Sequence, residues 1–405
     1  MTLTTFKLGC FAGSLALLLF CPPLEAQEAA PPSPNGSDTS TTFGAGKGIA
    51  RFFSQPLHPV IQPVASGGGL GAGIGYTFPT SERWDVNTKA VITPRKYWLA
   101  QFDGVYRARR GEAGAYARVR NMTRLNFFGS GANTVIADRS TFAMRDPVVG
   151  IFSSIRVLPA MELGGRVEEL WIHLDRGQDE TLPSVEQRFG DFEAPGLDRQ
   201  PRFARYQAFV EGIAPAGTRL SMNQGGRYRI TYDIYQDQEL GRYSFNRLQL
   251  EGRHTFAGFR PDHSISFHGW ISSAEAKDGQ QVPFFLQHTL GGTSNLRSLH
   301  EDPVGGDGTP GTLRGFQNLR FRDDHLMLLQ AEYRFGVWGP LDATVFADAG
   351  KAVRNRSELS LADLKRDYGF SLSMMRGAAT VARVDVGFGG GEGRRIFVGL
   401  GGLLP

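Results

Sequence analysis

A two-residue alternation of apolar and polar side chains constrains this fold more than any other feature of the sequence. Over residues 227–234, two tyrosines and two isoleucines alternate with two arginines, a threonine and an aspartate. Because successive side chains of a β-strand point to opposite faces, this pattern predicts a strand with one apolar and one polar face. After a turn expected at residues 236–241, residues 248–256 repeat the pattern. The chain is therefore predicted to be all-β.

Further segments are typical of strands of about ten residues, the length that crosses a bilayer obliquely. They are residues 98–106, 113–119, 265–271, 325–335 and 396–404. An arginine such as Arg229 or Arg253 turned toward mid-bilayer lipid would cost about 2 to 4 kcal/mol, so the charged face of a transmembrane barrel must line its lumen. A soluble β-protein would bury the apolar face instead, and alternation alone does not distinguish the two.

The N-terminus favours export and therefore the barrel. Lys7 supplies a positive charge, residues 15–20 are apolar, and the segment ending at Ala26 offers a small-residue cleavage site. We place the signal peptide at residues 1–26. A retained anchor is one alternative, and a lipoprotein processed at Cys21 is another, although Phe20 is bulky for a lipid-attachment site.

Cleavage after residue 26 would remove both cysteines, Cys10 and Cys21, and so exclude disulfide scaffolds and thiolate metal sites. The formal net charge is +4, and no clustered basic face indicates a nucleic-acid partner. Residues 27–50 have the composition of a disordered linker, and residues 51–405 are assigned to the barrel. We expect only about 40 residues between the cleavage site and the first strand, too few for a folded periplasmic domain of ordinary size.

Glycine is abundant, at 52 of 405 residues, and alternates with larger side chains over residues 67–76. Part of this run matches a dinucleotide-binding loop. Its period of two, and the lack of a following helix, favour a bent first strand instead.

Six short segments follow one another in the last third of the chain. They are Pro283-Phe284-Phe285-Leu286-Gln287, Leu290-Gly291-Gly292, Leu313-Arg314-Gly315-Phe316, Arg320-Phe321-Arg322-Asp323, Ala331-Glu332-Tyr333-Arg334-Phe335 and Phe346-Ala347-Asp348-Ala349-Gly350. In this order the sequence resembles the bacterial surface-antigen barrel of the outer-membrane assembly superfamily, the BamA/TamA type. Weaker similarity extends forward through residues 126–131 to about residue 50. The resemblance implies an antiparallel transmembrane barrel of about 16 strands in the bacterial outer membrane, with a long loop folded into the lumen.

The resemblance also implies a site inside the barrel, with Arg314-Gly315-Phe316 at the loop tip and Arg314 meeting Glu332 and Asp348 on the inner wall. A guanidinium is a planar fork that a carboxylate accepts bidentately, so one arginine could hold the loop through two acids. Gly315 would permit a tight turn and Phe316 would supply a packing surface. The alternative is that Arg314 is a solvated loop residue and the acids are ordinary lumen charges.

The sequence departs from the family pattern in three places. The connection before Arg314 is enlarged, with a near-copy of the motif at residues 296–299 and a Gly- and Pro-rich stretch at residues 304–311. The chain ends on Pro405, where such barrels usually end on an aromatic residue. Family members with known roles also carry periplasmic domains that receive client proteins, for which we expect no room here.

The expected function is insertion of outer-membrane proteins or translocation of macromolecules through a loop-gated lumen. The alternatives are a passive or gated diffusion channel and, third, a barrel enzyme. We find no nucleophile elbow, metal-ligand pair or triad order, and a lone strand histidine such as His254, His263 or His268 is typical of lumen lining. No enzymatic activity, cofactor or metal is therefore expected. The expected partners are outer-membrane lipids, client outer-membrane proteins or a separate periplasmic protein; the sequence does not identify the client or the oligomeric state.

Overall fold

The computed structural model describes residues 56–65, 67–214, 223–258, 260, 262–292, 311–376 and 379–400. Residues 47–405 form one compact unit. The expected signal peptide (1–26) and linker (27–50), the motif near-copy at 296–299, most of the Gly- and Pro-rich stretch and the last five residues lie outside the described part.

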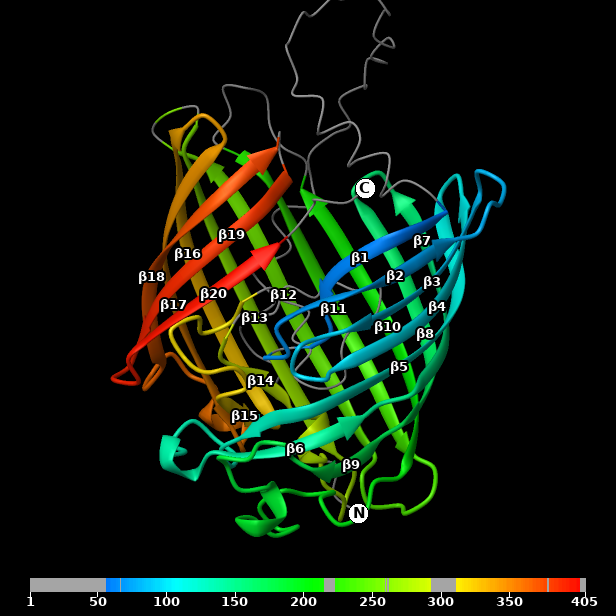
Figure 1. Ribbon diagram of the computed structural model, residues 1–405, viewed down its shortest axis with the longest axis vertical. Helices are drawn as coiled ribbons and strands as arrows, with labels where there is room; N and C mark the ends of the chain where they lie inside the picture. The colour runs from blue at the N-terminus through cyan, green and yellow to red at the C-terminus, as the bar shows by residue number, and fades with distance from the viewer. Residues whose placement is uncertain are drawn as a thin grey trace, which may run out of the picture. The chain divides into compact units, whose positions relative to one another are not determined.

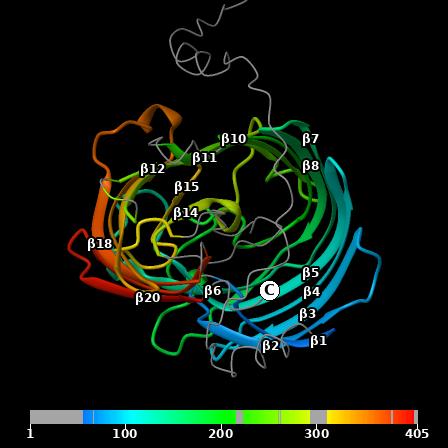
Figure 2. The same cartoon turned by 90° about the horizontal axis from the view of Figure 1, so that it is seen from above.

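An 18-stranded antiparallel sheet makes up the described unit, and sixteen of its strands pair in chain order. These are β1 (Leu57–Pro63), β2 (Leu70–Thr77), β3 (Trp84–Ile92), β4 (Trp98–Ala108), β5 (Gly111–Phe127), β7 (Val148–Leu158), β8 (Met161–Trp171), β10 (Arg202–Ala214), β11 (Asn223–Asp237), β12 (Phe245–Ala257), β13 (Ser264–Ala276), β16 (His325–Trp338), β17 (Leu341–Val353), β18 (Lys365–Arg376), β19 (Ala379–Gly389) and β20 (Arg394–Leu400). The prediction of an antiparallel barrel fold is confirmed, and the strands bend round a common interior (Figures 1 and 2). No ladder joins β1 to β20 within the described residues.

The other two strands of the large sheet, β6 (Ser140–Arg145) and β9 (His173–Arg176), form a branch beside β5. The first half of β5 pairs with β7, whereas its second half continues past the wall and pairs with β6. The branch lies at the end of the barrel that also carries the long connection 172–201 and the described parts, 277–292 and 311–324, of a second one, here called the long-loop end (Figure 1). The opposite end, with turns of two residues after β4, β7 and β16, is the short-turn end.

Burial is inverted relative to a soluble β-protein. On β11, Tyr228, Ile230 and Tyr232 are 43 to 46% exposed, whereas Thr231 and Asp233 are 3% and 0% exposed. Because the polar side chains face inward and the apolar ones outward, the alternation has the pattern of a membrane barrel. The question that the sequence left open is thereby decided in favour of a charged lumen.

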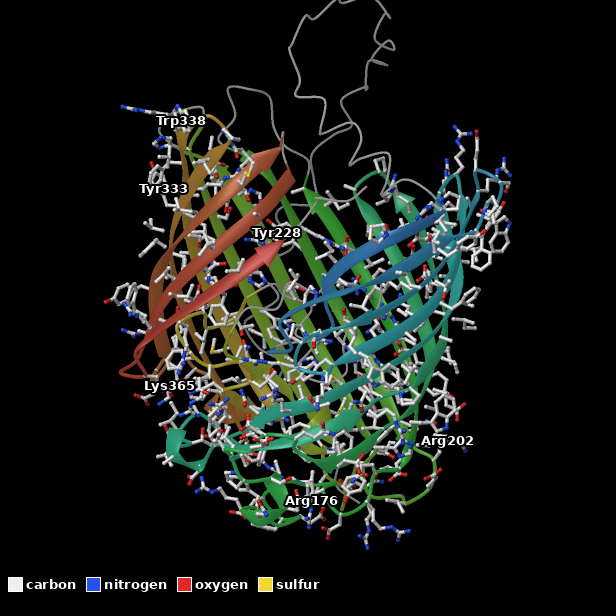
Figure 3. All side chains as sticks on the ribbon, viewed as in Figure 1. Arg176, Arg202, Tyr228, Tyr333, Trp338 and Lys365 are labelled. Atoms are coloured by element: carbon white, nitrogen blue, oxygen red, sulfur yellow. The ribbon has the colours of Figure 1, made fainter. Side chains whose placement is uncertain are left out.

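Aromatic side chains gather on the outer face near the short-turn end. Trp338 is 78% exposed, and both it and Tyr333 point away from the wall (Figure 3). The rings of Trp84 and Tyr106 lie 5.2 Å apart between their centroids on β3 and β4. Such a belt is typical of side chains at a membrane–water interface.

The first strand differs from the prediction. The alternating glycines occupy the β1–β2 turn and β2, the second strand, rather than a bent first strand. The sequence did not reveal β1 because Pro59 and Pro63 interrupt its pattern, and proline is tolerated in a strand chiefly at a sheet edge, where β1 lies.

Among the described residues, no helix is long and apolar enough to span a membrane.

Apolar side chains pack together at the long-loop end. The connection between β13 and β16 contains the 3₁₀ turn η4 (Phe284–Leu286) and the small hairpin of β14 (His288–Leu290) and β15 (Phe321–Asp323). Phe284 packs edge-on against both Phe127 and Phe142, with 5.0 Å between ring centroids in each pair. These fully buried rings fix the loop that carries the candidate site.

Candidate functional site

Arg314 lies in the limb between β14 and β15, where short backbone hydrogen bonds shape the loop. The Gly292 amide donates to the Leu313 carbonyl at 3.1 Å, and the Thr312 amide donates to the Gly292 carbonyl at 3.0 Å. The Phe316 amide in turn donates to the Leu313 carbonyl at 3.1 Å, which turns the chain at Arg314. The guanidinium is thereby presented to the barrel wall.

The structure places Arg314 against both acids of the predicted site. Its Nε and Nη2 donate to the two carboxylate oxygens of Asp348 at 2.8 and 2.6 Å, and its Nη1 donates to Glu332 at 2.5 Å. The Arg314 backbone amide also donates to Asp348, at 3.2 Å. Arg314 and Asp348 are 3% and 2% exposed, so this bidentate pair is shielded from water.

The two acids differ in their other partners. Glu332 on β16 also accepts hydrogen bonds from Arg253 at 3.1 Å and from Arg383 at 3.4 Å. Asp348 on β17 accepts, besides the hydrogen bonds from Arg314, one from the side-chain amide of Gln330 at 3.1 Å. Its cross-strand neighbour on β18 is a further carboxylate, Asp367. Arg314 is therefore the one cation bonded to Asp348 in the described structure, whereas Glu332 has two others.

The face of Phe346 covers the guanidinium on its remaining side. The Arg314 Cζ lies 3.6 Å from the centroid of this ring, which is on β17 two residues before Asp348. Burial alone would lower the pKa of Arg314, but the hydrogen bonds and charges of Asp348 and Glu332 outweigh it and raise that pKa. The guanidinium is held in its charged form.

Gly315 allows the loop backbone to touch the wall. A Cβ at this position would lie 2.5 Å from the Gly389 amide nitrogen and 2.6 Å from the Phe388 carbonyl carbon of β19. The contact is mutual, since a Cβ at Gly387 would lie 2.7 Å from the Arg314 carbonyl. Close approach, rather than an unusual backbone angle, explains why this position is glycine.

Phe316 anchors the tip on the apolar side. It is 3% exposed and belongs to a buried cluster with Leu313, Leu290 and Trp270. Its ring meets that of Phe321 edge-on at 5.1 Å between centroids. The motif thus combines a charged contact, a backbone contact and an apolar contact within three residues.

Two further arginines hold the return limb of the loop. Arg320 donates to Glu392, in the β19–β20 turn, at 2.7 Å and to the Thr134 hydroxyl at 2.6 Å. Arg322 lies over the rings of Phe127, Phe142 and Phe284 at 5.4 to 5.7 Å and donates to the Phe284 carbonyl at 2.8 Å. Burial lowers the pKa of Arg322 to about 9, which leaves it protonated at neutral pH.

Sequence reasoning missed Phe346, Arg383 and the roles of Arg320 and Arg322. Phe346 is part of a quoted segment, but nothing in the sequence indicates that its ring faces an arginine. Arg383 alternates with Val384 on β19, and this alternation is the signal that could have placed it in the lumen. The anchors of Arg320 come from parts of the chain 186 and 72 residues away.

The histidines separate into different environments. His268 is 7% exposed and bonds to Gln330 at 2.7 Å and Glu251 at 3.1 Å inside the barrel. His254 bonds to the outward-facing Tyr228 at 2.6 Å, so its assignment to the lumen lining is wrong. The reason is register, because His254 falls in phase with the outward-facing Leu248 and Leu250. No group of three or more potential metal ligands occurs among the described side chains.

The fold and the site together define an antiparallel barrel of the membrane type with a loop pinned inside it. Among solved structures, the chain is similar to "BamA from Haemophilus ducreyi lacking POTRA domains 1-3", with a TM-score of 0.54 at 11% identity over 87% of this chain and 76% of that one. The described unit therefore has the fold of a BamA-type barrel.

Two CdiB structures show the same likeness. CdiB from Escherichia coli aligns with a TM-score of 0.54 at 9% identity over 86% of this chain and 68% of that chain. CdiB from Acinetobacter baumannii aligns with a TM-score of 0.50 at 11% identity over 83% of this chain, which spans 56% of that protein's length. No family model and no curated protein matches the sequence.

Proposed function

We propose that this chain is an outer-membrane barrel that inserts outer-membrane proteins or translocates macromolecules, and that the loop pinned by Arg314 gates its lumen. The observation that carries the proposal is the Arg314 site itself. A buried guanidinium bonded to Asp348 and Glu332 creates a docked loop that differs from a released loop by a discrete set of contacts. In this proposal the loop alternates between these docked and released arrangements, as a gate requires.

The location and the partners form part of the same proposal. The likeness of the fold to BamA and CdiB and the resemblance to the outer-membrane assembly superfamily support an outer-membrane barrel with protein clients. The inverted burial of the strands supports contact with lipid. A separate periplasmic protein would receive the clients if this chain has no domain for that task.

Deletion of the chromosomal gene tests the assembly or translocation role. We expect one or more outer-membrane or exported proteins to be depleted, and the wild-type gene to restore them. A variant with Arg314→Ala, present in the membrane at the wild-type amount, is expected to restore them only in part. Unchanged membrane and exported protein profiles after deletion would contradict the proposal.

A gated diffusion pore is the second candidate, favoured by the polar lumen wall. Arg205 donates to Glu168 at 2.8 Å and to Asp233 at 2.7 Å, and all three side chains are buried on the inner face. Ion-paired inner walls suit the passage of water and small polar solutes once a loop moves aside. A diffusion pore predicts that deletion of the gene leaves the outer-membrane and exported protein profiles unchanged and slows the uptake of small solutes.

A further inference from the structure

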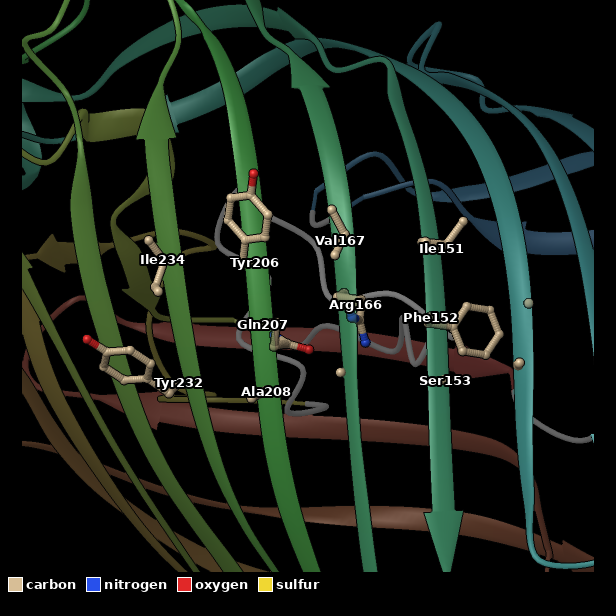
Figure 4. A pocket seen from close by; sticks show the side chains of 13 residues that line it. Ile151, Phe152, Ser153, Arg166, Val167, Tyr206, Gln207, Ala208, Tyr232 and Ile234 are labelled. Atoms are coloured by element: carbon tan, nitrogen blue, oxygen red, sulfur yellow. The ribbon is translucent and has the colours of Figure 1, made fainter.

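The outer face of the barrel has two hollows where small residues replace larger ones. The first, of about 590 Å³, crosses β7, β8 and β10, where Ser153, Gly165 and Ala208 pair across neighbouring strands (Figure 4). Ile151 and Tyr206 stand beside this floor (Figure 4). Every side chain that lines it from the outer face is uncharged, because the lining Arg166 is buried in the wall.

The second hollow, of about 780 Å³, is lined by residues from β11 to β18 and is here called the lipid groove. Its floor includes Ala331 and Ala347, which pair across β16 and β17. In the same row, Phe267 pairs with Ala331 and Tyr368 pairs with Ala347, and these two rings are 52% and 66% exposed. Leu329, 41% exposed, forms part of the adjoining row. The groove is therefore an apolar channel with aromatic walls that faces the lipid side.

Arg366 lies at the β18 end of the lipid groove, close to the long-loop end of the barrel. It is exposed, lines the groove beside Ala349 and is in phase with the outward-facing Tyr368. Its side chain has no hydrogen-bond or ion-pair partner among the described residues. Another outward-facing arginine at this end is paired, since Arg202 lies 3.1 Å from Glu169. Arg366 thus offers an unmatched positive charge at the end of an apolar channel.

We propose that the lipid groove binds one membrane lipid with a net negative headgroup, whose acyl chain lies over Ala331 and Ala347 and whose phosphate bonds to Arg366. The inference rests on the proposed location of the chain in a membrane. From β12 to β18 the groove crosses five strands at a spacing of about 4.8 Å, and so offers roughly 19 Å for an acyl chain. A guanidinium binds a phosphate through two parallel hydrogen bonds, which an exposed arginine can form without rearrangement of the wall.

A second copy of the chain fits the groove less well than a lipid does. In a two-fold interface the same patch contributes both sides, and the outward-facing described side chains that line this patch include no acid to pair with Arg366. An anionic amphiphile complements both the apolar floor and the charge. The first hollow has the apolar floor without the cation, and it serves as an internal control.

Photo-crosslinking in vesicles tests the proposal. The purified full chain is reconstituted in phosphatidylcholine vesicles that contain a photoactivatable acyl-chain probe, either phosphatidylglycerol or phosphatidylcholine, and adducts are mapped by mass spectrometry. We expect the phosphatidylglycerol probe to label β16 to β18 more than the phosphatidylcholine probe does. The Arg366→Gln variant should lower that label about fivefold, the factor expected for one basic residue at a membrane surface.

The matched variant is Arg202→Gln, which removes a rim charge that already has an acidic partner; labelling of the lipid groove should stay within twofold of wild type. Labelling of the first hollow should be the same for both probes and both variants. Equal labelling of the lipid groove by the two probes, or an equal loss in Arg202→Gln, would overturn the proposal. Protein–protein adducts at the groove that exclude both probes would assign it to a second copy. No lipid adduct on any strand would instead contradict the membrane location itself.

Discussion

Replacement of Arg314 by alanine should release the loop from the wall. The substitution removes the only cation bonded to Asp348 among the described residues and leaves this buried side chain with hydrogen bonds from the Gln330 amide and the backbone amide of residue 314, beside Asp367 as its cross-strand neighbour. Removal of one partner from a buried ion pair costs about 3 to 5 kcal/mol, chiefly because the other charge stays buried and uncompensated. The population of released loop should rise by roughly two to four orders of magnitude.

Limited proteolysis of the purified barrel measures this release, because cleavage of residues 311–320 requires the loop to leave its packed position. When the loop opens and closes faster than the protease cuts, the cleavage rate follows the population of the released state. Arg314→Ala should be cleaved at least a hundredfold faster than wild type. Cleavage of Arg314→Ala at the wild-type rate would refute the proposed lock.

Two double variants test which unpaired acid, Asp348 or Glu332, destabilises the docked loop in Arg314→Ala. Asp348→Asn in the Arg314→Ala background removes the uncompensated charge and should slow cleavage at least tenfold relative to Arg314→Ala. Glu332→Gln in the same background should slow it less than threefold, because Glu332 keeps its contacts with Arg253 and Arg383. Equal rescue by both substitutions would show that the unpaired charge of Asp348 is not the main cost.

Three further predictions concern the parts of the loop around this lock. Gly315→Ala places a Cβ 2.5 to 2.7 Å from atoms of β18 and β19 and should destabilise the docked loop by about 1 to 3 kcal/mol, measured as faster cleavage. Alanine at Gly190, where a Cβ would meet no atom within 4 Å, should leave the cleavage rate unchanged. Burial raises the pKa of the loop residue Asp323 to about 6, above the value of about 3.9 expected for a released loop. Since the docked loop binds the proton more tightly, its stability should fall by about 2 kcal/mol as the pH rises from about 4 to 6. Hydrogen exchange of the β14–β15 hairpin at pH 4.5 and 7.5 should show this loss, and Asp323→Asn should flatten it; an unchanged pH profile in that variant would refute the assignment. Arg320→Ala breaks the buried pair with Glu392 and should speed hydrogen exchange of the β19–β20 turn by an amount equivalent to about 3 kcal/mol. Exchange of this turn at the wild-type rate would contradict the role of Arg320 as an anchor.

The strand pattern could be predicted because a barrel wall repeats a local rule. Tyr228, Ile230 and Tyr232 face outward as a consequence of their two-residue spacing alone, and the expected strand from residue 325 to 335 lies within β16. The spacing could not predict which face of the sheet meets water, since that depends on what surrounds the sheet. It also failed at β1, where prolines hide the alternation, and at the β6–β9 branch, which depends on how far β5 extends beyond the wall.

The site could be predicted only in its ion-pair partners. Arg314, Glu332 and Asp348 have complementary charges that a sequence displays, and the resemblance supplied their pairing. Phe346, Gly387 and Gly389 act through shape, by covering the guanidinium and by admitting the backbone of Gly315. Such contacts depend on register between a loop and strands that lie far away in the chain, and no local pattern in the sequence records that register.

Single-channel conductance of the purified barrel in a planar bilayer tests the central claim, a lumen gated by the loop that Arg314 pins, most directly. The wild-type chain should give small or flickering openings, because the docked loop and the buried rings at the long-loop end obstruct the lumen. Arg314→Ala should give larger and longer openings, and Asp348→Asn in that background should reduce them. A large, steady wild-type conductance that Arg314→Ala leaves unchanged would contradict the gate.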